Sequence, residues 1–217
     1  MISPLICMGQ GGWISIWGGA NMHRYDGRYT ISAPAAPVLG FRYGHDLGSS
    51  FRFIIGLEHE WAMTRQKTQS FQSVEFFTEV SSRMNNLQLL GLIRIKSSEQ
   101  MELRAMFGAV GRTYVQATSR TWSSADTVVN ERVLTGNDIG GSFRLQAGLR
   151  FARQLNGHLY GFAEGWAGMA FINGEEWISF GVAHGGVRVP IPRYSVGLNV
   201  GLEFGPRLMP QKAPVTG

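Results

Sequence analysis

A set of charged side chains recurs at alternate positions of otherwise apolar or small-residue segments. In a β-strand successive side chains point to opposite faces, so each segment would carry its charges on one face only. If those faces line a narrow barrel, opposite charges must pair, because an unpaired buried charge costs several kcal/mol. The set therefore predicts either a mutually neutralising ion-pair network or, given its excess of arginine, the lining of a narrow pore or anion-binding cavity. Its members are Arg42, Arg52, Glu58, Glu60, Arg94, Glu102, Arg104, Arg112, Arg144, Arg150, Glu164 and Glu203.

Catalytic and metal chemistry find little support in the sequence. Glu58-His59-Glu60 resembles a metal-ligand cluster, but in a strand His59 points away from both glutamates, so the three cannot share one ion. Pairing of Glu58 and Glu60 with Arg52 or a neighbouring arginine is favoured. A Ser/His/acid site at a lipid surface needs His and Ser on adjacent outward positions. His184 is the only candidate for this, and Ser179 lies five residues away, on the opposite face. We expect no catalytic, metal or cofactor site, and no enzyme.

The composition favours a membrane β-barrel. The chain has 217 residues with 29 Gly, only 8 Pro, 16% charged residues and a mean hydropathy of −0.05. No apolar run approaches the ~18 residues that a membrane helix needs. Half of each strand of a membrane barrel faces the lumen, which explains the neutral mean hydropathy. The single cysteine, Cys7, excludes an internal disulfide framework, and the dispersed basic residues argue against nucleic-acid binding.

The clearest strand is Tyr194 to Phe204, Y-S-V-G-L-N-V-G-L-E-F. One face is wholly apolar with an aromatic residue at each end, and the other face is small, polar or charged. This is the design of a transmembrane barrel strand, with its apolar face toward lipid and aromatic residues at the two interfaces. Similar alternation predicts strands at 12–19, 38–43, 51–63, 87–96, 101–115, 143–151, 159–169, 178–189 and 194–204, and a further one at 72–80.

The connections also follow a pattern. Long ones at 21–34, 64–86 and 116–139 alternate with short ones at 44–48, 97–99, 154–157 and 190–193, and Asn156-Gly157 predicts a hairpin turn. Outer-membrane barrels have this asymmetry, with long extracellular loops and short periplasmic turns. Bacterial single-chain barrels have even strand numbers. We therefore predict an all-β, antiparallel, up-and-down transmembrane barrel of eight strands, with one extra segment outside the membrane. Ten strands are the alternative.

Two segments carry a resemblance to a known family. G-W-I-S-I-W-G-G at 12–19 and V-G-L-N-V-G-L-E-F at 196–204 resemble strands of the small outer-membrane β-barrel proteins of Gram-negative bacteria, and the resemblance in pattern covers nearly all of 12–204. It implies location in the outer membrane, contact with its lipid and lipopolysaccharide, and recognition of the last strand by the barrel-assembly machinery. Members of the family usually end near the final aromatic residue, whereas thirteen residues follow Phe204 here.

The domain and function predictions follow. Residues 1–10 are expected to be a signal-peptide remnant or a disordered leader, 11–205 the barrel and 206–217 a flexible tail. The expected role is structural or interactive, with a filled, charge-paired interior and extracellular hairpins that contact a partner; a narrow pore is the alternative. Gly11-Gly12-Trp13 also matches the opening of soluble lipocalins, so a soluble ligand-binding barrel remains open, as does a lipid-modifying enzyme. Aromatic strand ends and the low charge favour the membrane.

Overall fold

The structure is a computed structural model that describes residues 11–25, 31–71, 74–123, 128–135, 141–171, 177–180, 187–190 and 192–206. The predicted leader at 1–10 and nearly all of the predicted tail at 206–217 lie outside these residues. None of the described residues forms a helix that is long and apolar enough to cross a membrane.

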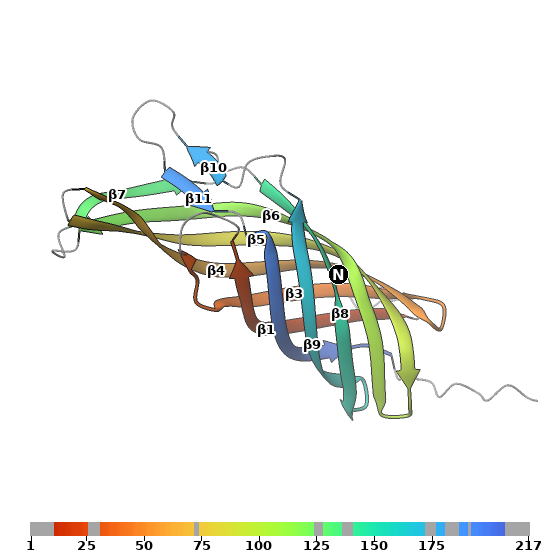
Figure 1. Cartoon of the computed structure of the whole chain (residues 1–217). Helices are drawn as coiled ribbons and strands as arrows, with labels where there is room; N and C mark the ends of the chain where they lie inside the picture. Colours follow the sequence, from red (N-terminus) through yellow and green to blue (C-terminus); the bar gives the residue numbers. More distant parts are fainter. Residues whose placement is uncertain are drawn as a thin grey trace, which may run out of the picture.

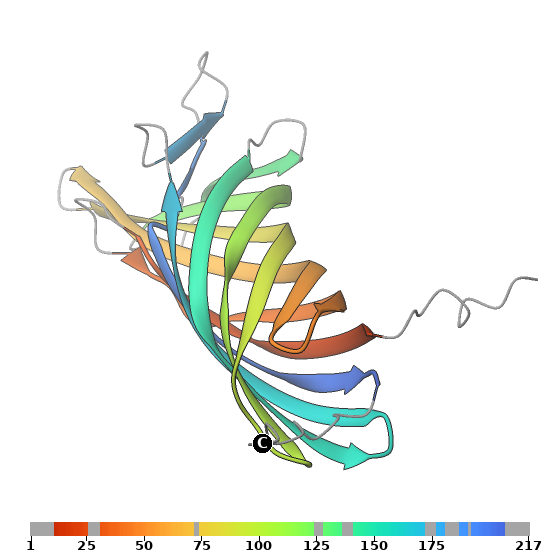
Figure 2. The ribbon, with the colours of Figure 1, turned by 90° about the vertical axis from the view of Figure 1, so that its right-hand side faces the viewer.

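Eight long strands form a closed antiparallel barrel (Figures 1 and 2). Strand β12 pairs with β1 from Ile14 opposite Phe204 to Arg24 opposite Tyr194, and this pairing closes the ring. The predicted closed, eight-stranded barrel is confirmed, and the ten-stranded alternative is wrong. The strands of the ring are β1 (Gly12–Arg24), β3 (Ala36–Leu47), β4 (Phe51–Phe71), β5 (Val74–Ser97), β6 (Met101–Ser123), β8 (Gly141–Asn156), β9 (Leu159–Phe171) and β12 (Tyr194–Phe204).

Four shorter strands lie outside this ring. They are β2 (Ile31–Ser32), which pairs with β4, β7 (Val128–Thr135), which pairs with β6, and the hairpin of β10 (Trp177–Phe180) and β11 (Val187–Pro190). The hairpin falls in the predicted strand 178–189, which therefore does not enter the barrel. The connection predicted at 190–193 is consequently the last part of the link between β9 and β12, rather than a short turn.

The long connection predicted at 64–86 is a hairpin of two strands that projects beyond the apolar belt, and it contains the further strand predicted at 72–80. Strand β4 continues to Phe71 and pairs with β5 along its length, so the predicted strands 72–80 and 87–96 are one strand. The mostly polar stretch at 81–86 lies between these two segments and carries no apolar alternation, so the sequence alone divided the strand. At 116–139, strand β6 runs on to Ser123 and pairs with β7, which confirms the predicted protruding hairpin.

The short and the long connections between strands of the ring lie at opposite ends of the barrel, as predicted. The links β3–β4, β5–β6 and β8–β9 lie at one end, which we call the turn end, and each is only two or three residues long. Gly48 and Gly157 have φ values of 79° and 47° there, a backbone region that favours glycine. The other end, which we call the loop end, carries the longer connections. The first predicted turn is shifted, because β3 extends through Leu47.

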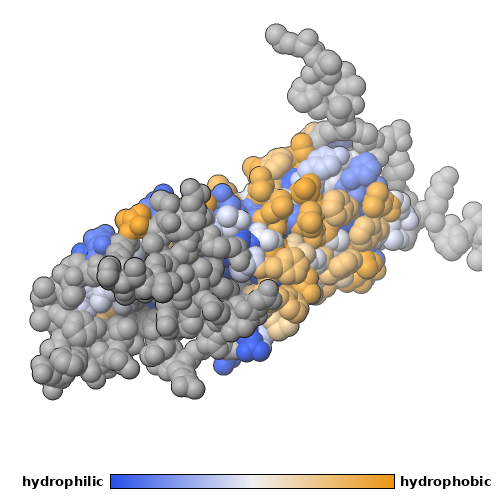
Figure 3. Space-filling view, turned by 90° about the horizontal axis from the view of Figure 1, so that it is seen from above, coloured by the Kyte–Doolittle hydropathy of each residue, from blue (hydrophilic) through white to orange (hydrophobic). Residues whose placement is uncertain are grey.

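The two faces of the barrel are chemically opposite. A belt of exposed apolar side chains surrounds its outside, and Figure 3 shows hydrophobic residues gathered over one half of the molecule. Charged and amide side chains fill the inside. A soluble lipocalin-like barrel would have the reverse arrangement, so that alternative is wrong. An apolar surface of this extent marks a membrane-facing protein. The belt includes Ile16, Leu39, Phe41, Phe53, Ile55, Leu57, Leu87, Leu89, Ile93, Phe107, Leu145, Leu149, Phe151, Leu198, Val200 and Leu202.

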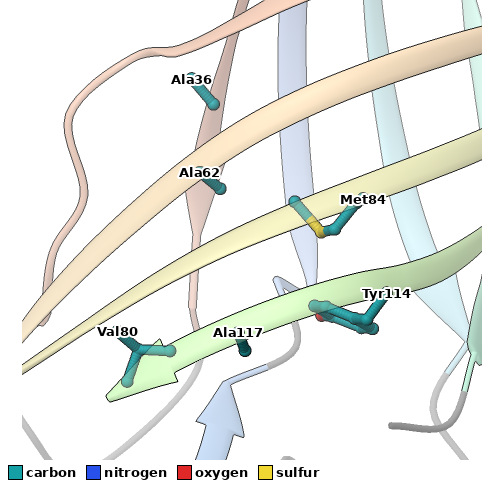
Figure 4. Packing of buried hydrophobic residues seen from close by; sticks show 6 residues of the cluster. All are labelled: Ala36, Ala62, Val80, Met84, Tyr114 and Ala117. Carbon is teal, nitrogen blue, oxygen red and sulfur yellow. The ribbon is translucent and has the colours of Figure 1, made fainter. Parts of the chain in front are cut away.

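Strands β4, β5 and β6 continue beyond this belt at the loop end and, with β7, form a protruding sheet (Figure 1). We call this part the extension. Its inward face carries a buried cluster at the point where the sheet leaves the barrel (Figure 4), made of Ala36, Ala62, Val80, Met84, Tyr114 and Ala117.

Candidate functional site

The structure brings the predicted charged residues together inside the barrel. All but one are buried, with exposed fractions of 0–6%. The exception, Arg94, lies at the turn end with 14% of its side chain exposed. The buried members are Arg42, Arg52, Glu58, Glu60, Glu102, Arg104, Arg112, Arg144, Arg150, Glu164 and Glu203. They form three successive layers along the barrel axis.

The layer at the turn end is a continuous ion-pair network. The Arg52 guanidinium donates to Asp46 and to Glu203, each at 2.7 Å. Glu203 also accepts a bond from Arg150. Glu102 accepts from Arg94 and from Arg104, both at 2.8 Å. These contacts satisfy the carboxylates with charge-assisted hydrogen bonds, which are about twice as strong as neutral ones.

The middle layer is centred on Glu164. Arg42 Nη1 lies 2.7 Å from both of its carboxylate oxygens, and Asn199 Nδ2 donates to it at 2.8 Å. Arg150 Nη1 is 3.8 Å away, so this arginine links the middle layer to Glu203. The Arg42 Nε donates to Gln88 Oε1 at 2.7 Å. Removal of Glu164 would leave Arg42 buried without a carboxylate partner.

The layer at the loop end is centred on Glu60. Its carboxylate accepts from Arg112 at 3.2 Å, Asn21 at 3.1 Å and Asn86 at 3.0 Å, and it contacts His23 Nε2. The other ring nitrogen of the histidine, Nδ1, lies 2.8 Å from Ser195 Oγ. Within this layer Ser195, His23 and Glu60 therefore form a hydrogen-bonded chain.

Two charged groups at the loop end have no opposite charge within 4.0 Å among the described residues. Glu58 accepts hydrogen bonds from the amides of Asn86 and Gln88 at 2.6 and 2.7 Å. Arg144 donates to Gln146 Oε1 at 3.1 Å, and its Nε and Nη1 have no hydrogen-bond partner in the described part of the chain. Arg104 also has two donor atoms without a partner among the described residues, but it is paired with Glu102, whereas Arg144 has no carboxylate partner there.

Tryptophan rings separate the arginines from the barrel wall. The Arg42 guanidinium lies 4.5 Å from the centre of the Trp17 ring, Arg52 lies 3.8 Å from Trp13, and Arg144 lies 4.1 Å from Trp166. Each ring lies against a glycine of the neighbouring segment of chain, where a Cβ would overlap the ring. These glycines are Gly40 under Trp17, Gly205 under Trp13 and Gly197 under Trp166.

The resulting glycine–tryptophan–arginine stacks fill the lumen as well as neutralising it. Arg150 also lies over the Phe162 ring at 3.8 Å. Tyr114, Tyr160 and Trp166, which the sequence places on the inward face, are all buried there. Large rings and paired charges therefore occupy the interior of the barrel. An eight-stranded barrel has an interior just wide enough for its own side chains.

Sequence reasoning missed several uncharged or loop-assigned members of this interior, among them the four that follow. His23 and Asn21 fall in the predicted loop 21–34, and Asp46 falls in a predicted turn. Ser195 is part of a predicted strand but carries no charge. The phase of Trp13 and Trp17 continues to Asn21 and His23 at every second residue, and this signal could have extended the first strand.

The side chains of Glu58-His59-Glu60 do not come together in the structure. His59 points outward, as expected; it lies 2.7 Å from Asn85 Oδ1 and beside the Trp61 ring, away from Glu58 and Glu60. Among the described residues there is no group of three or more His, Cys, Asp or Glu side chains that could bind a metal ion. His184 lies outside the described residues, and the Ser179 side chain is not described.

Comparison with known proteins gives similarity of fold only. No protein-family model and no curated protein matches the chain. Among solved structures, the outer membrane protein OprG from Pseudomonas aeruginosa is 14% identical with a TM-score of 0.48, covering 90% of this chain and 97% of OprG. Neisserial surface protein A is 11% identical with a TM-score of 0.44 and the same two coverages. Ail of Yersinia pestis is 15% identical with a TM-score of 0.40, covering 90% of this chain and 99% of Ail. Similarity at this level carries no inference about function.

Proposed function

We propose that this protein is an outer-membrane anchor that presents the extension to a partner outside the cell. The observation that carries the proposal is the extension itself. From Ala62 to Phe71, strand β4 continues beyond the apolar belt, and at about 3.3 Å per residue this length corresponds to roughly 30 Å of strand. A barrel that served only to fill the membrane would not need it.

The orientation of the barrel in the membrane follows from the different lengths of the connections at its two ends. Transmembrane barrels of the bacterial outer membrane have an even number of antiparallel strands, short periplasmic turns and longer extracellular loops. The turn end is then periplasmic, and the extension projects from the outer surface. Outer-membrane lipid surrounds the belt, and lipopolysaccharide would contact its outer rim.

The surface of the extension suits contact with another molecule. Phe77 and Trp122 stack across β5 and β6 with ring centres 6.0 Å apart, and both are partly exposed. Arg65 is exposed beside Glu79, to which it donates at 2.7 Å. Val133 on β7 is 58% exposed although it lies beyond the belt. Aromatic rings and arginines are enriched where proteins bind partners.

The packed interior favours an anchor over a pore. Arg104 and Arg144, which could attract anions in an open channel, are buried with exposed fractions of 2% and 5%. The first is paired with Glu102, and the second is stacked on Trp166. An anchor gains stability from such packing, whereas a pore would need the space.

A shortened barrel tests the proposal. Arg65 and Glu79 are paired across β4 and β5, and Arg120 and Glu131 are paired across β6 and β7. Residues 66–78 and 121–130 can therefore each be replaced by Asn-Gly, the preferred two-residue hairpin turn. The shortened chain should still insert and show heat-modifiable migration on a gel. Cells displaying it should lose adhesion to surfaces coated with protein, glycan or lipid relative to cells displaying the full chain. Equal adhesion by both, on every surface to which the full chain binds, would contradict the proposal.

A further inference from the structure

We propose that a groove on the outer surface of β8, β9 and β12 holds an anionic glycerophospholipid, with its phosphate on Arg153 and one acyl chain along the groove. The groove lies near the turn end, so the lipid would come from the periplasmic leaflet. This inference goes beyond the anchoring role and takes from it only the orientation of the barrel. The two proposals fail independently, because the extension contributes no residue to the groove and lipid binding is measured without adhesion.

The groove forms because β9 places its large side chains inward and small ones outward. Tyr160 and Phe162 are buried in the lumen, whereas Gly161 and Ala163 face lipid between β8 and β12. The space left above these two small residues has a volume of about 480 Å³, within the usual range of ligand sites, roughly 300–1,000 Å³. Its walls are Phe151 and Leu155 of β8 and Val200 and Leu202 of β12.

The walls are suited to an acyl chain. All four wall side chains belong to the apolar outer surface, with exposed fractions between 44% and 65%. Ala163 is opposite Phe151 on one side and Val200 on the other, so the floor lies directly between the two walls. A chain in this groove would touch protein on three sides, whereas a chain on a flat part of the belt touches it on one. The groove therefore favours one fixed position for the chain.

Arg153 places a positive charge in the lining of this groove. It is opposite Gly161 on β9 and Met101 on β6, and its side chain is exposed on the lipid-facing side. It makes no hydrogen bond or ion pair with the described residues. Three residues separate it from Asn156 at the end of β8, roughly 10 Å of strand. A long side chain at this depth reaches the headgroup region, where the cost of a lipid-facing arginine is small.

A lipid phosphate is the counter-charge that the membrane offers at this position. A guanidinium binds phosphate oxygens through two parallel hydrogen bonds. The acyl chains of a lipid run from its phosphate toward the middle of the membrane, which is the direction from Gly161 to Ala163 along β9. One lipid can therefore pair with Arg153 and fill the groove together. The arginine favours an anionic headgroup over a zwitterionic one, whose amine offsets the phosphate charge.

A second groove on the outer surface provides an internal comparison. Its volume is similar, about 460 Å³, and its lining includes Phe53, Leu89, Phe107 and Ala109. None of the residues that line it carries a charge. It should accept acyl chains without selecting a headgroup, so the difference between the two grooves isolates the contribution of Arg153.

The test uses the full chain refolded in detergent micelles and phosphatidylglycerol with a photoreactive diazirine in one acyl chain. Mass spectrometry of the crosslinked protein should place most of the label around Phe151, Ala163 and Val200. Phosphatidylcholine with the same diazirine should label this groove about fivefold less, the order expected for one basic residue at a membrane surface. Equal phosphatidylglycerol labelling of both grooves in the wild-type chain would overturn the proposal, and this result depends on the folding of no variant.

Four variants separate the charge from the shape of the groove. Arg153→Gln should lower phosphatidylglycerol labelling of the groove about fivefold, whereas Lys96→Gln, which removes an exposed cation at the same end but outside the groove, should leave it unchanged. Ala163→Leu fills the floor and should also lower labelling, whereas Ala109→Leu in the second groove should not. Heat-modifiable migration shows which variants are folded. A folded Arg153→Gln variant that still prefers phosphatidylglycerol to phosphatidylcholine in this groove would also overturn the proposal.

Discussion

The glycine–tryptophan–arginine stacks predict a sharp difference between two glycine substitutions. Gly197 faces inward on β12, and an ideal Cβ there would lie within 3.0 Å of three atoms of the Trp166 ring, closer than real Cβ contacts allow. The ring cannot move away freely, because the Arg144 guanidinium lies 4.1 Å from its centre on the lumen side. Gly111 faces lipid on β6, and a Cβ there would meet nothing within 4 Å.

The two substitutions should change the free energy of unfolding in opposite directions. Overpacking of this kind costs about 1–3 kcal/mol, and loss of a desolvated arginine–aromatic contact adds up to about 2 kcal/mol. Gly197→Ala should therefore lower the free energy of unfolding by about 2–4 kcal/mol. Gly111→Ala should leave it unchanged or raise it by about 0.5–1 kcal/mol, since alanine loses less backbone entropy than glycine on folding.

Urea unfolding in phosphatidylcholine vesicles, followed by heat-modifiable migration and tryptophan fluorescence, measures both variants. The wild-type chain and both variants should be compared at one lipid-to-protein ratio. Equal unfolding midpoints for Gly197→Ala and Gly111→Ala would refute the inference that Trp166 is clamped between Gly197 and Arg144.

Two further predictions use the same unfolding assay. Glu164→Gln should lower the free energy of unfolding by about 3–5 kcal/mol because it leaves the buried Arg42 without its carboxylate. Glu79→Gln on the exposed extension should lower it by under about 1 kcal/mol. Similar losses for the two variants would show that the interior is hydrated. Leu198→Arg, on the apolar belt and 73% exposed, should cost about 2–4 kcal/mol, whereas Val133→Arg beyond the belt should change the stability little. A tolerated Leu198→Arg would contradict the placement of the belt in lipid.

The sequence alone was sufficient to identify the strands that have one face against lipid. Strict alternation in Tyr194–Phe204 and in the inner half of β4 identified both strands and their inward residues. Pairing of β12 with β1 resolved whether the last predicted strand closes the barrel. That pairing depends on contacts between distant segments, which local alternation does not encode.

The other parts of the fold and of the barrel interior lacked an alternating apolar pattern in the sequence. The mostly polar stretch at 81–86 within β5 lacks apolar alternation, so the sequence divided this one strand into two segments, 72–80 and 87–96. His23 and Ser195 are uncharged and uninformative singly; only the register of β1 against β12 brings them together. The stacks on Gly40, Gly197 and Gly205 likewise depend on which glycine lies opposite which tryptophan.

Conductance across a planar lipid bilayer tests the central claim, a barrel whose interior is filled by its own paired side chains. The wild-type chain, inserted and verified by heat-modifiable migration, should produce no discrete current steps in KCl. Discrete steps that disappear when Arg104 and Arg144 are replaced by glutamine would contradict the claim and show that these residues line an open pore.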